Sequence, residues 1–209
     1  MMKEAVLILY EFLTVMVPAG IGLGILCRKK ENRNIQIVVM IIFAVYLFAV
    51  LHITGAGTIY DVIRNGLEIN EKQINLVPFS EYNLNRSVYI TQALLNIILF
   101  VPFGVLVPRI WQNYRKVWSI LLSGFLLSFL IEFSQLLNYR SFDIDDLIYN
   151  TAGALFGALL FKLIFRSERW NRLKGRHGNV EMILLTIAAF LFRFLLFDEI
   201  GAAKLLYGF

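Results

Sequence analysis

The densest group of chemically active side chains lies in one short polar stretch between two apolar runs. In this stretch Arg140 is followed by three carboxylates, those of Asp143, Asp145 and Asp146. A guanidinium can grip a phosphate or a carboxylate through two parallel hydrogen bonds, and the carboxylates could bind a divalent ion or orient Arg140. The alternative is a solvated hairpin in which the aspartates cap a helix and form local ion pairs. The spacing matches no specific metal motif, and we expect neither a metal nor a cofactor.

Six further polar side chains lie inside long apolar runs, where each costs free energy if the run crosses a bilayer. They are Glu11, Asn96, Glu132, Gln135, Asn150 and Arg193. We predict that the six gather at one depth in a polar cluster that opens outward and binds a ligand. The alternative is a structural role, in which interhelical hydrogen bonds and ion pairs, such as Glu11 or Glu132 with Arg193, hold the bundle together.

Helical spacing aligns several of these groups, because residues four and seven apart lie on the same face of a helix. One such face carries Ser128, Glu132 and Gln135, and a second carries Asp146, Asn150, Gly153 and Gly157. Glycines four residues apart allow two helix backbones to approach closely. We therefore expect Gly153 and Gly157 to pack against another helix, and the same spacing predicts the same role for Gly20 and Gly24.

The elements that must position these side chains are apolar helices. Of the 209 residues, 58% are apolar and 17% are charged, and the mean hydropathy is +0.68. A soluble domain is nearer half apolar and a quarter charged, so that class is excluded. Six runs approach the roughly 20 residues that cross a bilayer, and none alternates as barrel strands do. The runs are Ala5–Leu26, Ile35–Thr54, Tyr89–Val107, Val117–Leu137, Leu147–Phe165 and Met182–Phe197. We predict an all-α polytopic bundle of about six spans, in a single membrane domain.

Basic residues in the connecting loops set the predicted orientation. The loops after the first, third and fifth runs carry twelve Lys and Arg residues, whereas the opposite side carries six over a longer length. The more basic side of a membrane protein is the cytoplasmic one. We therefore predict a multi-pass cell-membrane protein with both termini outside. The first run lacks a cleavage pattern and is expected to remain as a span. Confinement of the basic residues to short loops argues against nucleic-acid binding.

One long outer loop covers residues 55–88 and contains two distinct segments. The first has the spacing of a short amphipathic helix lying on the membrane. Its apolar face comprises Ile59, Val62, Ile63 and Leu67, and its polar face comprises Asp61, Arg64 and Glu68. The second segment, Asn75–Ser80, is apolar and contains Pro78 and Phe79, so we predict a re-entrant or packed loop there.

Four segments of the chain, taken in order, resemble the VanZ-like family of bacterial membrane proteins, named for a member linked to teicoplanin resistance. They are Asn75–Phe79, Asn96–Gly104, Ile131–Gln135 and Arg140–Gly153. The resemblance covers about residues 35–165, so the runs at 5–26 and 182–197 flank it. It implies signature polar positions, without a catalytic role, at Glu132, Gln135, Arg140, Asp143, Asp146 and Asn150. The doubled Asp145–Asp146 leaves open which of the two aspartates acts.

The resemblance implies a non-enzymatic envelope factor that binds membrane lipids or a lipid-linked, cell-wall-related group at the outer leaflet and lowers glycopeptide susceptibility. The alternative is a membrane-embedded enzyme, with Glu132 or an aspartate as general base and Arg140 holding a phosphate or carboxylate. The sequence contains no nucleophile elbow, P-loop or zinc-protease motif, and His52 and His177 lie in no recognisable catalytic pattern. A small transporter is a third hypothesis, disfavoured because the inner halves of the runs carry few polar groups.

Overall fold

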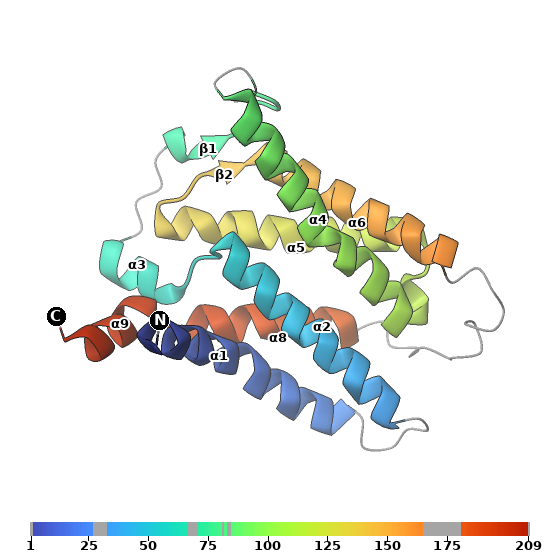
Figure 1. Ribbon diagram of the computed structural model, residues 1–209, viewed down its shortest axis with the longest axis horizontal. Helices are drawn as coiled ribbons and strands as arrows, with labels where there is room; N and C mark the ends of the chain where they lie inside the picture. The colour runs from blue at the N-terminus through green and yellow to red at the C-terminus, as the bar shows by residue number, and fades with distance from the viewer. Residues whose placement is uncertain are drawn as a thin grey trace. The chain divides into compact units, whose positions relative to one another are not determined.

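The computed structural model describes residues 2–26, 33–66, 71–80, 82, 85–164 and 181–208. The described chain is almost entirely helical (Figure 1), which confirms the predicted all-α class. It divides into two compact units. The terminal unit comprises Met1–Glu68 and Ile183–Phe209, and the central unit comprises Ile69–Met182. The single membrane domain stays a prediction. Eight of the twelve basic residues in the loops after the first, third and fifth runs, and His177, lie outside the described residues.

Within its described residues, the terminal unit is built from five helices. They are α1 (Met2–Leu26), α2 (Arg33–Thr54), α3 (Ile59–Asn65), α8 (Glu181–Leu196) and α9 (Glu199–Tyr207). Helix α1 contacts both α2 and α9 (Figure 1). The side chains of Val15, Phe43 and Leu47 are buried, whereas many other apolar side chains of these helices are exposed. Apolar exposure on this scale is expected of helices whose surroundings are lipid.

Helix α3 begins at a cap that the sequence supplies locally. The Asp61 carboxylate accepts hydrogen bonds from the backbone N–H of Thr58 at 2.6 Å and from its hydroxyl at 2.9 Å. Gly66, with a φ of 76°, ends the helix. The predicted short helix is present, and Ile63 on its apolar face is 68% exposed. Its placement on a membrane surface stays a prediction, and Leu67 and Glu68 lie outside the described residues.

The described part of the central unit consists of three long helices joined by short turns. The long helices are α4 (Arg86–Ile110), α5 (Val117–Gln135) and α6 (Ile144–Ile164). The 3₁₀ turns are Glu71–Gln73, Gln112–Tyr114 and Leu136–Asn138, and the two-residue strands are β1 (Ile74–Asn75) and β2 (Phe142–Asp143). Helix α6 contacts both of the other long helices, most extensively α4, which lies beside it in Figure 1.

Close packing of α4 against α6 depends on glycine. A Cβ atom added to Gly157 would lie 2.8 Å from the Gly104 Cα and would meet the Val101 carbonyl. A Cβ atom on Gly153 would meet the Ile97 carbonyl. The structure thus places both glycines against α4, so that the two backbones touch. Gly20 differs, because no described atom lies within 4 Å of the position its Cβ would take. The expected packing at Gly20 is therefore absent from the described chain.

Helix α5 shows the polarity of a membrane bundle, with polar groups inside and apolar groups outside. Phe125, Phe129 and Phe133 stack along its exposed face. Ser128 and Glu132 on another face are buried, with 0% and 2% of their surfaces exposed. A soluble helix would bury the opposite face. This arrangement brings Glu132 into the interior of the unit.

Five helical segments are long and apolar enough to cross a membrane, by length and composition and within the described residues. They overlap α1, α2, α4, α5 and α6, and correspond to the first five predicted runs. The sixth run forms α8, whose 16 residues extend about 24 Å, less than the hydrocarbon core of about 30 Å. The sequence predicted about six spans, and the described residues contain five helical segments of spanning length.

Two predicted boundaries near the acidic stretch shift in the structure. Helix α6 begins at Ile144, three residues before the predicted start, because Asp145 and Asp146 favour the first turn of a helix, where the backbone dipole is positive. Helix α5 ends at Gln135 and continues as a 3₁₀ turn, which stops at Tyr139 in the left-handed conformation with a φ of 61°. The acidic stretch is thus a tight connection between α5 and α6.

Candidate functional site

A short parallel bridge joins the two loops that the sequence singled out. In it β1 pairs with β2, so that Ile74 lies beside Phe142 and Asn75 beside Asp143. The Asn75 side-chain amide also donates a hydrogen bond to the Asp143 carboxylate at 3.2 Å. The Asn75–Ser80 loop is therefore fixed to the acidic stretch between α5 and α6, although residues 75 and 143 are far apart in the sequence.

Asp145 makes a further contact between the two loops, and its role differs from that of the neighbouring Asp146. We call the region where these two loops meet α4, α5 and α6 the junction. Its side chain is 3% exposed, and its carboxylate accepts hydrogen bonds from the Phe79 backbone N–H at 2.9 Å and from the Tyr89 hydroxyl at 2.9 Å. The Tyr89 hydroxyl also lies 2.6 Å from that of Tyr149. Phe79 has a φ of 61°, a left-handed conformation uncommon for a bulky residue. Asp145 thus holds the Phe79 loop in place.

Glu132 connects the same turn to the interior of α5. Its carboxylate accepts a hydrogen bond from the Asp143 backbone N–H at 3.1 Å. The Asp143 carboxylate in turn accepts from the Asp145 backbone N–H at 2.9 Å, which fixes the turn into α6. Among the described residues, no other group makes a hydrogen bond or an ion pair with Glu132. A buried carboxylate is thus held by a single neutral donor.

Asp146 and Asn150 point toward the other two long helices. The Asn96 amide of α4 donates to the Asp146 carboxylate at 2.5 Å. The Asn150 amide donates to the Ser128 hydroxyl of α5 at 2.9 Å. Asn150 is 1% exposed, and its side-chain oxygen has no partner within the described part of the chain. These contacts connect α4, α5 and α6 at one end of the unit.

Gln135 and Arg140 lie on either side of the turn. Gln135 is buried at the end of α5, and its carbonyl accepts a hydrogen bond from the Arg140 backbone N–H at 3.1 Å. The Arg140 side chain is exposed, so its guanidinium stands at the surface of the same turn whose interior holds Glu132. No three His, Cys, Asp or Glu side chains in the described ranges are placed to hold a metal ion. The described contacts of Asp143 and Asp145 are hydrogen bonds that shape the turn.

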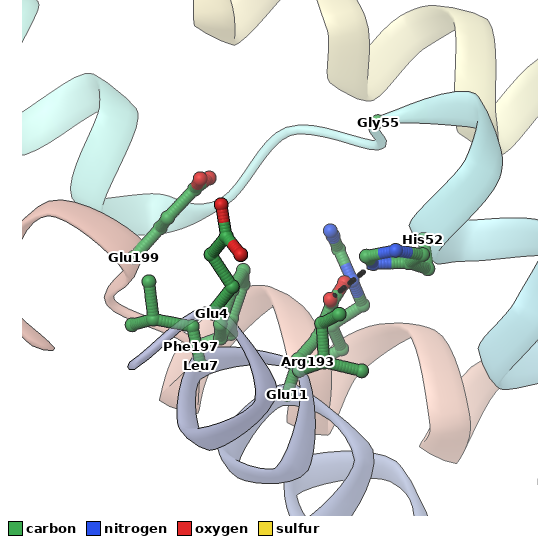
Figure 2. Close-up of a pocket in the computed structure, with 9 residues that line it drawn as sticks. Glu4, Leu7, Glu11, His52, Gly55, Arg193, Phe197 and Glu199 are labelled. Carbon is green, nitrogen blue, oxygen red and sulfur yellow. Dashed lines mark hydrogen bonds and ion pairs between the residues drawn. The ribbon is translucent and has the colours of Figure 1, made fainter. Parts of the chain in front are cut away.

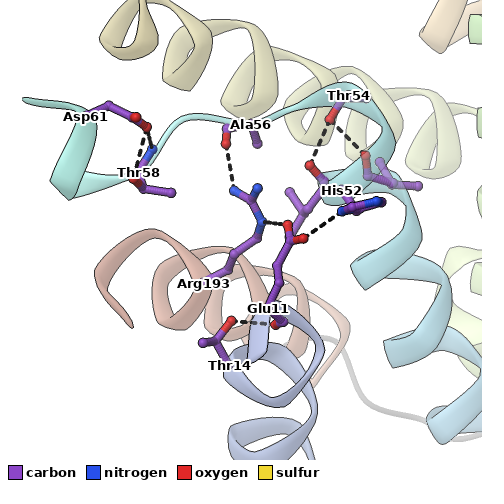
Figure 3. Close-up of polar contacts among 10 residues, drawn as sticks. Glu11, Thr14, His52, Thr54, Ala56, Thr58, Asp61 and Arg193 are labelled. Carbon is purple, nitrogen blue, oxygen red and sulfur yellow. Dashed lines mark hydrogen bonds and ion pairs between the residues drawn. The ribbon is translucent and has the colours of Figure 1, made fainter. Parts of the chain in front are cut away.

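Glu11 and Arg193 belong to a second polar cluster, in the terminal unit (Figure 2). The Arg193 Nε lies 2.7 Å from a Glu11 carboxylate oxygen, and Nη1 donates to the Ala56 carbonyl at 2.6 Å. The second Glu11 oxygen lies 2.6 Å from His52 Nδ1 (Figure 3). Glu11 and Arg193 are 2% and 4% exposed. This is an interhelical ion pair of the kind that the structural alternative predicts.

The described contacts of the six intramembrane polar groups each lie within one unit, and the single outward-opening cluster stays a prediction. Glu11 and Arg193 pair in the terminal unit, and the other four lie in the central unit. Depth along a helix follows from sequence position, whereas the choice of neighbouring helix does not.

The sequence analysis missed three residues that belong to these polar contacts. His52 lies in no catalytic motif, yet it contacts Glu11. The sequence feature that could have predicted this contact is that α2 ends on the side of the bundle where α1 begins. Tyr89 and Tyr149 are aromatic residues of apolar runs, and nothing local marks them as partners of a buried carboxylate. Their roles depend on how α4 and α6 rotate toward the loops.

The fold and this site define an all-α polytopic membrane protein with a polar junction where three helices meet two loops. The VanZ/LLP1 family matches residues 37–166, more than half of the chain. The chain therefore belongs to that family, as the sequence resemblance predicted. The match includes all of the central-unit junction and most of α2, whereas α1, α8 and α9 lie outside it. No curated relative and no solved structure matches the chain.

Proposed function

We propose that this protein is a bacterial envelope factor that binds a lipid-linked or cell-wall-related group at the outer leaflet, and thereby lowers glycopeptide susceptibility. The observation that carries the proposal is the environment of Glu132. Its carboxylate is 2% exposed and is held, within the described residues, by one backbone N–H. Burying a carboxylate with so little compensation costs several kcal/mol by general estimates. Such a cost is expected where the charge serves a ligand.

Arg140 supplies the complementary group at the surface of the same turn. An exposed, planar guanidinium suits a phosphate or a carboxylate, because it donates two parallel hydrogen bonds. Asp143 and Asp145 shape the turn on which it stands. In the proposed complex, Arg140 grips the anionic part of the ligand, while Glu132, with Asp146 and Asn150 deeper in the unit, binds its polar remainder.

The proposal requires the junction to face outward. The excess of basic residues in the loops after the first, third and fifth runs supports this orientation, with both termini outside. A reporter enzyme that is active only in the cytoplasm, fused after Phe209, should be silent. Strong reporter activity at that position would mean that the orientation is reversed or that the sixth run does not span.

Glycopeptide susceptibility of a strain that expresses single variants tests the function. Glu132→Gln keeps the shape and the hydrogen bond but removes the charge, so we expect a folded, membrane-inserted protein that no longer protects the strain. Arg140→Lys keeps the charge but loses the two-pronged geometry, and should impair protection nearly as much as Arg140→Ala. The matched control is Glu71→Gln, an exposed carboxylate of the same unit, which should retain full protection. Full protection by Glu132→Gln at normal stability would contradict the proposal.

A membrane-embedded enzyme is the second candidate, and the same observation favours it. A buried carboxylate with a single hydrogen bond is also the arrangement of a general base awaiting a proton. Mass spectrometry of lipids extracted with the purified protein separates the two. An unaltered, stoichiometric envelope lipid favours the binding factor, whereas a precursor that changes chemically during incubation favours the enzyme.

A further inference from the structure

The loop that follows β1 presents a short apolar tip, residues Leu76–Phe79, to its surroundings. Leu76, Val77 and Phe79 are 62%, 64% and 54% exposed, and Pro78 between them is exposed as well. Contiguous exposed apolar side chains of this kind mark a contact with another protein or with a membrane. The backbone and the position of the tip decide between these two partners.

The backbone donors of the apolar tip are paired within the protein. The Val77 N–H donates a hydrogen bond to the Asn75 side-chain oxygen at 3.3 Å. The Phe79 N–H donates to the Asp145 carboxylate at 2.9 Å, and Pro78 between them has no N–H. Backbone donors that enter lipid need partners inside the protein, because hydrocarbon offers none. The three residues therefore meet this requirement for entering a bilayer.

The conformation of Phe79 keeps its ring on the outside. Its φ of 61° is a left-handed conformation, which costs free energy for a bulky residue unless the surroundings hold it. Both oxygens of the buried Asp145 carboxylate contact the Phe79 N–H, at 2.9 and 3.0 Å. The Asn75 amide closes the base of the loop by donating to the Ser80 hydroxyl at 3.0 Å. The loop is thus held in a form that leaves Phe79 exposed.

The apolar tip lies at the level where a spanning helix leaves the hydrocarbon. Asp145, which holds Phe79, belongs to the first turn of α6. The 21 residues of α6 extend about 31 Å, close to the hydrocarbon thickness of about 30 Å. The start of α4 lies at the same end of the unit (Figure 1). There the Arg86 guanidinium lies 5.2 Å from the centre of the Tyr82 ring, and both residue types are typical anchors at the membrane interface.

The apolar surface continues from the tip into α4. Val88, Ile90 and Leu94, near the start of this helix, are 48%, 41% and 53% exposed. On a helix of spanning length such side chains meet lipid. We propose that the apolar tip inserts into the bilayer at the boundary between headgroups and acyl chains, and so anchors the junction at that depth. The partner of the tip is lipid, whichever leaflet the junction faces and whatever ligand it binds.

Fluorescence quenching in vesicles tests the proposal. The chain has one cysteine, Cys27, so Cys27→Ser gives a cysteine-free background. In this background Val77→Cys is labelled with a nitrobenzoxadiazole dye, and the full chain is reconstituted into phosphatidylcholine vesicles. A lipid spin-labelled near the top of its acyl chain should quench this dye about threefold more strongly than a dye at Glu71→Cys, an exposed position of the same unit. Aqueous iodide should quench it about threefold less strongly.

Two further positions keep the test decisive. Ile98→Cys is the reference within the bilayer, because Ile98 is 62% exposed near the middle of α4. Leu76→Cys repeats the measurement at a second tip position, and as an exposed substitution it should leave the melting temperature unchanged. Equal quenching by iodide at residues 77 and 71 would overturn the proposal, because the tip would then lie in water. Failure of both quenchers to reach residue 77 would overturn it as well, because a second copy of the chain or another protein would then cover the tip.

Discussion

The terminal and central units compensate buried charge in different ways. In the terminal unit the buried carboxylate of Glu11 meets an opposite charge, that of Arg193. In the central unit the described partners are neutral: a backbone N–H for Glu132, and a backbone N–H with a tyrosine hydroxyl for Asp145. A carboxylate paired with an arginine is neutralised by the fold itself. One held by neutral donors has no opposite charge among its hydrogen-bonding partners.

The units also differ in how closely their helices approach. In the central unit, Gly157 and Gly104 bring the backbones of α4 and α6 into contact. In the terminal unit, Gly20 of α1 faces open space in the described chain. The central unit is thus the more rigidly packed of the two at these positions, as suits a junction that must hold several loop residues in register.

The largest expected effect comes from breaking the ion pair of the terminal unit. Arg193→Met leaves the buried Glu11 carboxylate without its arginine, and we expect the free energy of unfolding to fall by about 3–5 kcal/mol. The measurement is chemical unfolding in detergent. The double variant Arg193→Met/Glu11→Gln should recover part of the loss, because no unpaired charge then remains. A single variant as stable as the unmodified protein would show that Arg193 does not compensate Glu11.

The same substitution in both units gives the sharpest test of the comparison. Glu11→Gln leaves the buried Arg193 guanidinium uncompensated and should cost about 3 kcal/mol. Glu132→Gln keeps an acceptor for the Asp143 N–H and removes a buried charge, so the free energy of unfolding should stay within about 0.5 kcal/mol. Both values come from unfolding curves under one set of conditions. Equal losses would mean that the two carboxylates play the same structural role.

Adding one methyl group should separate the two kinds of packing. Gly157→Ala places a Cβ against the backbone of α4 and should destabilise the protein by about 1–3 kcal/mol, because backbone atoms cannot move aside cheaply. Gly20→Ala is the matched control, and should be neutral or slightly stabilising, since alanine favours the helix. Melting temperatures of the two variants provide the comparison. A larger loss at Gly20 would reverse the assignment.

The smallest effect is expected at the half-buried ion pair between α3 and α9. Arg64 Nη2 lies 2.6 Å from an Asp198 carboxylate oxygen, and the two side chains are 26% and 23% exposed. Because water and salt screen such pairs, Arg64→Met should lower the free energy of unfolding by at most about 1 kcal/mol. Asp198 also caps α9 by accepting from the Gly201 N–H, so the arginine is the partner to replace. A loss as large as that of Arg193→Met would contradict the role given to burial.

The helices follow from the sequence alone, because their signals are local. Apolar runs of membrane-spanning length predicted the five long helices, and the Thr58–Asp61 spacing supplied the cap of α3. The ordered polar segments from Asn75 to Gly153 identified the family before any contact was known. Composition and spacing are short-range properties, so they are present in the sequence in full.

The partners of the polar groups were decided only by the tertiary structure. Sequence spacing left Arg193 with either Glu11 or Glu132, and the fold pairs it with Glu11, which is 182 residues away. It also gave Asp145 the Phe79 loop to hold, a contact across 66 residues. Such pairings depend on which helices are neighbours and how each is rotated about its axis. Neither quantity is encoded in the local pattern of apolar and polar residues, and that is why the sequence supplied the candidate residues of the site without supplying its contacts.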